Sequence, residues 1–461
     1  MITLRPYQEQ AVQIGVDYFR GPSTDPSIIV APTAYGKSVV ISTIANQLTG
    51  RTLVLQPSKE LLEQNFNKLM QMGGMASIYS ASMGEKEFGQ ITYATIGSIK
   101  NIGAKFKALG YTNVIVDECH LYPPSADSMF GTFINDLGHK KILGFTATPF
   151  RLQTNTSITG YRFSQLVMLT SRSKNAGFFK KILHVHQIGE MVKDKYWSPL
   201  EYEVYDSDTG RLTMNSTGAE FTDESVIKFY EEANLNQRIA RRVRDVPHKS
   251  ILIFVPMVSI AHELQTMIPD SVVIFGDMDK HTRDYSIKAF KAGRYRVAIN
   301  VNVLSVGFDY PGIDCVIMGR PTASLAWYYQ ALGRGTRIKE GKDRCTVIDF
   351  VGNVSRFGGI EGLTIEHDGN RWEVWSGDIQ LTSIPVSEIG TVMRGEKHGY
   401  RMPFGKHKGK SIDEVPITYL NWMLKEVTWS ERNTELKDQI KERIKRVSDG
   451  LGANAKTVKY S

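Results

Sequence analysis

The stretch Ile28-Ile-Val-Ala-Pro-Thr-Ala-Tyr-Gly-Lys-Ser38 places an apolar run directly before a loop that ends in Gly-Lys-Ser, and a second apolar run follows at residues 39–48. A strand, such a loop and a helix in this order are typical of a phosphate-binding loop, because backbone N–H groups and the helix N-terminus surround the phosphates. Lys37 would meet the β- and γ-phosphate charge, and the hydroxyl of Ser38 would bind Mg²⁺. The stretch therefore predicts an ATP and Mg²⁺ site, lined by Pro32, Thr33, Ala34, Tyr35, Gly36, Lys37 and Ser38.

Two adjacent carboxylates, Asp117 and Glu118, follow another apolar run at residues 113–116, and His120 lies two positions further on. Phosphoryl transfer depends on positioning and charge neutralisation more than on covalent chemistry. We therefore expect Asp117 to hold the Mg²⁺ shell and Glu118 to orient or deprotonate the attacking water. His120 is expected to couple the γ-phosphate site to the next motif.

The chain shows one alternation twice: short β-branched apolar runs separated by amphipathic stretches, over residues 28–148 and again over 250–349. This alternation is typical of a parallel sheet with crossover helices, so an α/β fold with two tandem domains is expected. We expect the first lobe with its crossing segment at residues 1–206 and the second at 207–355. An accessory region at 356–461 would contain a basic module at about 400–425.

The composition of the chain limits which kinds of protein it can be. The 461 residues are 41% apolar and 23% charged, and no run approaches the roughly 18 apolar residues of a membrane span, so a soluble protein of several domains is expected. The N-terminus lacks a secretory pattern and the three cysteines are widely spaced, which favours a cytoplasmic location. Of the net charge of +8, residues 390–461 carry +6, with 15 Lys and Arg against 9 Asp and Glu. That basic segment favours a polyanionic partner.

These motifs resemble those of superfamily 2 helicases of the DExH type, with Asp-Glu-Cys-His at residues 117–120, over about residues 1–351. The resemblance implies two RecA-like lobes around ATP and Mg²⁺. Leu4-Arg-Pro-Tyr-Gln8 resembles the adenine-reading motif, in which Tyr7 would stack on the base and Gln8 would bond its edge. Residues 145–149 resemble the motif whose hydroxyls, here Thr146 and Thr148, relay between ATP state and lobe closure.

The second lobe contains a stretch, residues 327–337, that resembles the last helicase motif. Arg334 and Arg337 are three positions apart, so on a helix they would face one cleft. The resemblance implies that Arg337 is the arginine finger, that Arg334 also lies in the cleft, and that Gln330 lies near the phosphates or the attacking water. Residues 302–312 resemble the fifth motif, in which Asp309 would contact the ribose or an arginine finger.

Contacts to a nucleic-acid backbone are expected from both lobes, at Pro57, Ser58, Lys59, Thr95, Pro256 and Asn302. The segment Phe404-Gly-Lys-His-Lys-Gly-Lys-Ser411 resembles a small basic module at the ends of some nucleases and phage proteins. Its Lys406, Lys408 and Lys410 would supply charges to phosphates. Tyr419 and Trp422 are expected in the miniature core of the module, although a merely solubilising appendage is the alternative.

A two-lobe motor without an accessory insertion, joined to this basic tail, is similar to phage-encoded branch-migration DNA helicases. The resemblance implies an ATP-dependent DNA helicase or translocase that tracks a single strand and remodels forks or Holliday junctions, with 3′ to 5′ polarity. Its location would be the cytoplasm, or the host cytoplasm for a phage chain, with no membrane partner. An RNA helicase, a duplex-DNA translocase and an ATP-gated nucleic-acid clamp are the alternatives, since backbone contacts do not identify the sugar.

Overall fold

The structure is a computed structural model. It describes residues 3–123, 125–138, 140–156, 162–171, 177–205, 207, 209–304, 308–393, 402–408, 412, 415, 417–427, 429 and 433–448. The chain divides into two compact units, residues 1–389 and 390–461, which are described separately. Lys410, one of the predicted phosphate contacts, lies outside the described residues.

The first lobe is built on a sheet with eight described strands in the order β10-β1-β7-β6-β2-β5-β3-β4. All neighbours are parallel except β3 and β4. The strands are β1 (Ser27–Val30), β2 (Arg51–Gln56), β3 (Ser77–Ser80), β4 (Glu85–Lys86), β5 (Ile91–Thr95), β6 (Tyr111–Val116), β7 (Lys141–Thr146) and β10 (Lys181–Val185). The five apolar runs of this half thus form strands as predicted, whereas β3, β4 and β10 were not predicted.

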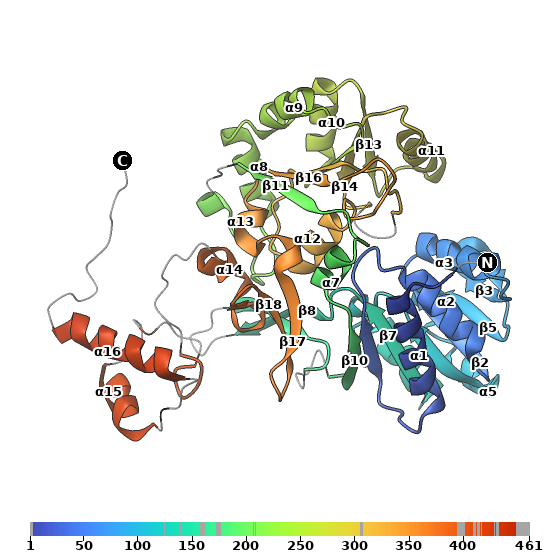
Figure 1. Ribbon diagram of the computed structural model, residues 1–461, viewed down its shortest axis with the longest axis horizontal. Coiled ribbons are helices and arrows are strands. Elements are labelled where there is room, and N and C mark those ends of the chain that lie inside the picture. Colours follow the sequence, from blue (N-terminus) through green and yellow to red (C-terminus); the bar gives the residue numbers. More distant parts are fainter. Residues whose placement is uncertain are drawn as a thin grey trace. The chain divides into compact units, whose positions relative to one another are not determined.

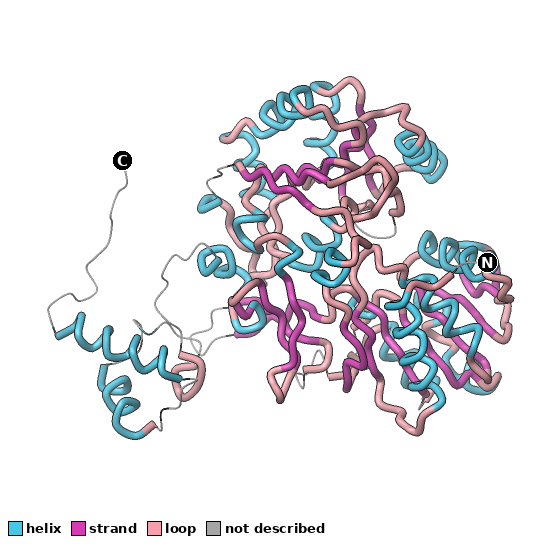
Figure 2. The backbone as a smooth tube through the Cα atoms, viewed as in Figure 1, coloured by secondary structure: helices cyan, strands magenta, loops and turns pink. Residues whose placement is uncertain are grey.

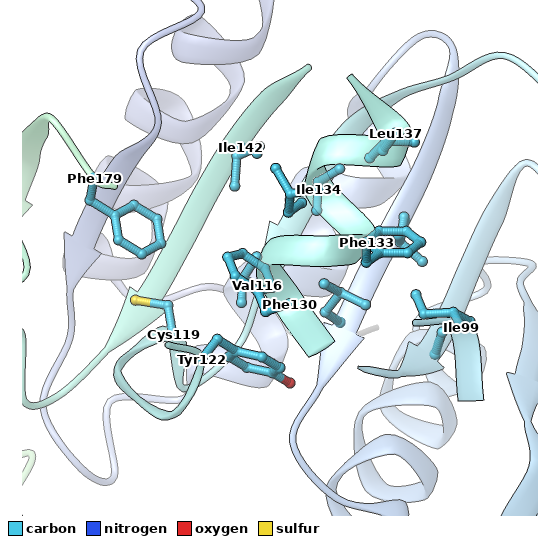
Figure 3. Packing of buried hydrophobic residues seen from close by; sticks show 14 of the residues in the cluster. Ile99, Val116, Cys119, Tyr122, Phe130, Phe133, Ile134, Leu137, Ile142 and Phe179 are labelled. Carbon is cyan, nitrogen blue, oxygen red and sulfur yellow. The ribbon is translucent and has the colours of Figure 1, made fainter. Parts of the chain in front are cut away.

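Helices flank this sheet, as Figures 1 and 2 show. They are α1 (Pro6–Arg20), α2 (Lys37–Gln47), α3 (Lys59–Gln71), α4 (Ile96–Ile99), α5 (Gly103–Ala108) and α6 (Met129–Leu137). Figure 3 shows how α6 packs Phe130, Phe133 and Leu137 into the core beside Val116 and Ile142 of the sheet. Each fully buried side chain of this size contributes roughly 1.5–3 kcal/mol, so this packing fixes where the strand ends lie.

The second lobe contains a parallel sheet with six described strands in the order β11-β16-β15-β12-β14-β13. They are β11 (Leu200–Val204), β12 (Ile251–Phe254), β13 (Ser271–Phe275), β14 (Val297–Val301), β15 (Cys315–Met318) and β16 (Cys345–Asp349). The helices are α8 (Asp223–Glu232), α9 (Leu235–Asp245), α10 (Val258–Met267), α11 (Lys280–Lys291), α12 (Leu325–Leu332) and α13 (Asn353–Phe357). The two tandem parallel-sheet α/β domains are therefore confirmed. Along the chain β11 is the first strand of this sheet, and it ends at Val204. The boundary that was expected at residue 206 therefore lies after the second lobe's sheet has begun.

Two small β elements accompany the lobes: a hairpin that was not predicted, and an antiparallel sheet within the accessory region expected from residue 356. A hairpin, β8 (Phe150–Thr156) and β9 (Arg162–Met168), directly follows β7 and precedes β10 in the chain. A three-stranded antiparallel sheet contains β17 (Leu363–His367), β18 (Trp372–Ser376) and β19 (Ile379–Gln380), followed by α14 (Val386–Met393). Gln187, just before α7 (Ile188–Lys193), exchanges two hydrogen bonds with the Ile365 backbone, which ties this sheet to the first lobe.

The second unit has α15 (Ile417–Glu426) and α16 (Thr434–Ser448). Its core is formed by buried apolar side chains, namely Met402, Ile412, Val415, Leu420, Met423, Leu436 and Ile440. Tyr419 packs against this core as expected, but Trp422 is 49% exposed, so the expectation that it is a core residue was wrong. Across the described parts of both units, no helix is long and apolar enough to span a bilayer.

Candidate nucleotide and nucleic-acid site

The predicted phosphate loop lies at the carboxyl end of β1 and leads into α2. Gly36 has a left-handed φ of 85°, and a Cβ there would lie 2.5 Å from Gln8 Nε2, so only glycine fits both the conformation and the space. The N–H groups of Val39 and Val40 both donate to the Gly36 carbonyl, at 2.9 and 3.3 Å, which starts the helix. The N-terminus of α2 therefore opens at Lys37, as a phosphate loop requires.

Lys37 forms an ion pair with Glu118, with 3.0 Å between Nζ and Oε1. Glu118 stands at the end of β6 in a left-handed conformation, φ 46°, and its other oxygen lies 3.5 Å from His120 Nδ1. Burial alone would raise the pKa of Glu118, but the charge of Lys37 and the influence of His120 outweigh it and lower that pKa. Glu118 is therefore an anion held between the Lys37 ammonium and the His120 ring.

Asp117 is buried at the end of β6, where its carboxylate accepts the Asn65 amide at 3.0 Å and the Glu118 N–H at 3.0 Å. Burial, followed by the repulsion of Glu118, raises the pKa of Asp117 to about 7, against the opposing pull of Lys37. Lone pairs remain on its oxygens. Asn65 also bonds Gln56 at 2.9 Å, and its positioning role was not predicted because it stands in the middle of α3.

A hydrogen-bonded chain connects the two lobes through His120. Its Nδ1 lies 2.8 Å from Thr146 Oγ1, and its Nε2 lies 3.3 Å from Nε2 of Gln330 on the second lobe. The Thr148 N–H donates to Thr146 Oγ1 at 3.0 Å. Burial lowers the pKa of His120 to about 4, against the opposing effect of Glu118, so the ring is neutral at pH 7. A neutral ring can donate from one nitrogen and accept at the other.

The phosphate loop and α12 are in direct contact. The Thr33 N–H donates to the Tyr329 hydroxyl at 3.3 Å, and Trp197 Nε1 donates to the Thr33 carbonyl at 2.7 Å. A Cβ on Gly333 would collide with the Thr33 side chain, so glycine permits this close approach. Pro32 and Thr148 line a small cavity of about 20 Å³ beside Tyr329. Trp197 and Tyr329 were not predicted as site residues.

Arg334 and Arg337 follow α12 on the same side of the cleft. Arg334 is buried and donates to the Phe308 carbonyl at 2.6 Å, while Arg337 Nε lies 2.6 Å from Asp309 Oδ1. Burial, followed by repulsion from Arg337, lowers the pKa of Arg334 to about 9, and Glu118 is among the charges that oppose this shift. Arg337 is held by Asp309. The expectation that the two arginines share a helical turn was wrong, because α12 ends at Leu332 and both follow it.

Tyr7 and Gln8 lie against the phosphate loop. Gln8 Nε2 donates to the Tyr35 carbonyl at 2.8 Å. The Tyr7 ring is 6% exposed and packs against Tyr35, His186 and Tyr196, with ring centroids 4.6, 5.0 and 4.9 Å away. Tyr7 is therefore an enclosed support of the loop in this structure, not an open surface for stacking.

The predicted nucleic-acid contacts lie at the carboxyl edges of the sheets: Pro57, Ser58 and Lys59 after β2, Thr95 at the end of β5, Pro256 after β12 and Asn302 after β14. Three of them also serve local structure. Ser58 Oγ accepts the Leu61 N–H and caps α3, Lys59 Nζ donates to the Ser82 carbonyl at 2.6 Å, and Thr95 Oγ1 lies 3.0 Å from Ser98 Oγ. Asn302 is exposed with a left-handed φ of 61°.

Glu60, next to Lys59, forms a second link between the lobes. Its Oε1 lies 3.5 Å from Arg283 NH2 on α11. In the second unit, Lys406 and Lys408 of the basic loop are both exposed. Each unit thus presents cationic groups to solvent.

Family models match both lobes. The model described as "Type III restriction enzyme, res subunit" matches residues 1–151, and "Helicase conserved C-terminal domain" matches residues 232–339. A third model, "Putative quorum-sensing-regulated virulence factor", matches residues 397–431.

Curated relatives include proteins with helicase and translocase names. "Putative ATP-dependent helicase IRC3" of Saccharomyces cerevisiae is 24% identical over 84% of this chain and 56% of its own length. The "51.5 kDa protein" of a Lactococcus phage is 25% identical over 71% of this chain and 66% of its own length. "DNA 3'-5' translocase XPB2" of Sulfurisphaera tokodaii is 25% identical over 74% of this chain and 80% of its own length. The chain thus spans less than two thirds of the first two.

Solved structures share the fold. The ATP-dependent Type ISP restriction-modification enzyme LlaBIII bound to DNA superposes with a TM-score of 0.54, 15% identity, and coverage of 85% of this chain and 29% of that one. S. cerevisiae Dbp5 bound to RNA and ADP BeF3 superposes with a TM-score of 0.50 and 17% identity, over 85% of this chain and 93% of that one. These likenesses confirm two RecA-like lobes. With a matching family model on each lobe, the chain carries the two domains of a superfamily 2 helicase.

Proposed function

We propose that this chain hydrolyses ATP between its two lobes and uses the cycle to move along DNA. The observation that carries the proposal is a hydrogen bond between the lobes, from Gln330 of the second lobe to His120 of the first, with 3.3 Å between the two nitrogens. His120 lies two positions after Glu118, which forms the ion pair with Lys37. Groups from both lobes therefore border one cleft. A nucleotide bound there would be enclosed by both, which makes hydrolysis conditional on closure.

The residues present fit ATP with Mg²⁺. Bound Mg²⁺-ATP would supply the transferable phosphoryl group and much of its charge neutralisation. Lys37 would hold the phosphate charge at the start of α2, and Ser38 and Asp117 offer oxygens of the kind that Mg²⁺ takes from proteins. Lys37 is the main cause that lowers the pKa of Glu118. Once phosphate draws Lys37 away, burial would raise that pKa, and the carboxylate would become a better proton acceptor for water.

The second lobe would contribute charge and coupling. Arg337, aligned by Asp309, and the buried Arg334 supply guanidinium groups that can stabilise charge on the transferring phosphoryl group. Gln330, His120 and Thr146 form the chain of contacts that would change when that group leaves. Loss of the bridge would let the lobes part, and repetition would advance the strand.

The finer proposal is that the substrate is branched DNA, such as a fork or a Holliday junction, and that movement is 3′ to 5′. Supporting it are a relative named as a DNA 3′–5′ translocase, a DNA-bound structural neighbour, and a C-terminal segment that carries +6 of the net charge. An RNA-bound neighbour has the same fold, so RNA is an arm of the test.

The experiment compares ATP hydrolysis and strand separation on single-stranded DNA, forked DNA, Holliday junctions and RNA duplexes. Lys37→Ala is the matched control, since it removes the cation that pairs with Glu118. We expect hydrolysis stimulated by DNA, separation of forks and junctions, and loss of both in the control. A control that still unwinds would exclude the proposed site, and greater activity on RNA would exclude the proposed substrate.

A further inference from the structure

We infer that the second unit contains a base-stacking site for single-stranded nucleic acid, with Trp422 as its platform and the loop at residues 404–408 as its phosphate contact. The first observation is exposure. All six tryptophans lie in the described part of the chain, and Trp422 alone among them is exposed, at 49%. A large exposed ring of this kind forgoes the free energy of burial, and tryptophan is enriched at interfaces, where its apolar face meets a partner.

The ring is also held in place. Trp422 packs on Tyr419 one turn earlier in α15, with ring centroids 5.3 Å apart and planes inclined by 32°. His407 packs edge-on against the same Tyr419 ring at 4.5 Å. Trp422 therefore rests on a buttressed tyrosine, so ordering it on a ligand would cost less conformational entropy than ordering a free side chain.

Tyr419 fixes the basic loop as well. The Lys406 N–H donates to its hydroxyl at 3.1 Å, and the Lys408 N–H closes a turn to the Gly405 carbonyl at 3.1 Å. Gly405 has a left-handed φ of 81°, and a Cβ there would lie 2.5 Å from the Tyr419 hydroxyl. The same tyrosine thus positions the exposed cations and the exposed ring beside each other.

This pairing selects one kind of ligand. Lys406 and Lys408 favour an anion, and Trp422 favours a flat apolar face. A single strand offers both features at once, because unpaired bases expose their rings while the phosphates remain charged. In a duplex the rings are stacked inside, so a duplex would satisfy only the lysines. The site takes DNA or RNA, since neither contact reads the sugar.

The inference deepens the proposed function, because it rests on the chain acting on nucleic acid. The test uses the full chain and titrates it with single-stranded DNA and RNA of one sequence. Trp422→Ala should weaken binding about tenfold, and Trp422→Phe should retain most of the affinity because it keeps an aromatic face. Asn421→Ala, an exposed neighbour on the same helix, is the matched control and should bind as the parent does.

The salt dependence of binding distinguishes the contribution of the Trp422 ring from that of the lysine charges. Trp422→Ala should leave the slope of log affinity against log salt unchanged, whereas Lys406→Ala with Lys408→Ala should reduce it by about 1.4, from roughly 0.7 for each phosphate contact. Fluorescence quenching by the oligonucleotide should fall in Trp422→Phe, which keeps the fold. Unchanged quenching in Trp422→Phe, or parental affinity of Trp422→Ala for both nucleic acids, would overturn the site. The ATP turnover of Trp422→Ala at saturating DNA should equal that of the parent. Loss of the stacking site would therefore change binding alone, whereas failure of the proposed motor would appear as absent turnover in the parent itself.

Discussion

At the residue scale, the Lys37–Glu118 ion pair links nucleotide binding to hydrolysis. Glu118 holds Lys37 at 3.0 Å, so Glu118→Gln removes the proton acceptor and also releases the lysine for phosphate. We expect ATP affinity to persist or rise while turnover falls about 10³-fold, within the range for losing a general base. Turnover and binding of a fluorescent ATP analogue are the measurements. Turnover within threefold of the parent would show that another group activates the water.

Asp309 and Arg337 are predicted to act as a unit. Asp309→Ala frees Arg337, which Asp309 holds at 2.6 Å, so we expect a fall in turnover of about tenfold, with a larger fall of about 10³-fold for Arg337→Ala. In the double variant the loss should match that of Arg337→Ala alone, because an absent guanidinium needs no alignment. Additive losses in steady-state ATPase measurements would mean that Asp309 acts on the nucleotide directly.

Some residues of the cleft could be predicted from the sequence and others could not. Lys37, Asp117 and Glu118 lie in short motifs, and the residues directly beside them in the sequence are enough to predict their roles. Asn65 and Trp197 stand in no such motif. Their partners, Asp117 and Thr33, are 52 and 164 positions away in the chain, so only the fold brings them together. The enclosed position of Tyr7 was hidden for the same reason, because His186 and Tyr196 come from a distant segment.

At the scale of elements, the central strands could be predicted because both faces are buried. β12 and β14 are buried at every position and read as apolar runs. β10 and β11 are edge strands with half-buried faces, and β11 reads Leu-Glu-Tyr-Glu-Val. β11 alternates as a half-buried strand does, but the sequence does not state which sheet such a strand joins, so the position of the crossing segment remained open.

Trp197, in the crossing segment, is predicted to position the phosphate loop. It is 2% exposed and its Nε1 donates to the Thr33 carbonyl, so Trp197→Phe keeps an aromatic ring but removes the hydrogen bond. A lost buried bond costs about 1 kcal/mol, which corresponds to about a fivefold increase in the KM for ATP. Trp327→Phe is the matched control, because the buried Trp327 Nε1 donates to no group in the described residues. Equal effects of the two changes would refute the positioning role.

At the scale of the whole molecule, side-chain contacts join the described parts of the two lobes at two places, one beside the predicted nucleotide site and one beside a predicted strand contact. One set joins Thr33 and His120 to α12 beside the predicted nucleotide site. The other is the Glu60–Arg283 pair, which lies next to the predicted nucleic-acid contact Lys59. Glu60 is 63% exposed and Arg283 is 20% exposed. A pair at such a surface contributes about 1 kcal/mol or less to stability, so a strand could break it at little cost. The lobes are thus joined by several buried contacts beside the predicted nucleotide site and by one weak ion pair beside the predicted strand contact.

The distribution of charge between the units leads to the last prediction. Removal of residues 394–461 leaves α14 intact but takes away six of the eight net positive charges. Because phosphate contacts act through counterion release, DNA affinity should fall steeply at low salt and little at high salt, which flattens the salt dependence. Basal ATP turnover should remain within about twofold, since the described nucleotide-site contacts lie within residues 1–389. Thermal unfolding of the truncated chain serves as the control for folding. An unchanged salt slope would mean that the lysines of the second unit contact no phosphate and that the motor alone grips the strand.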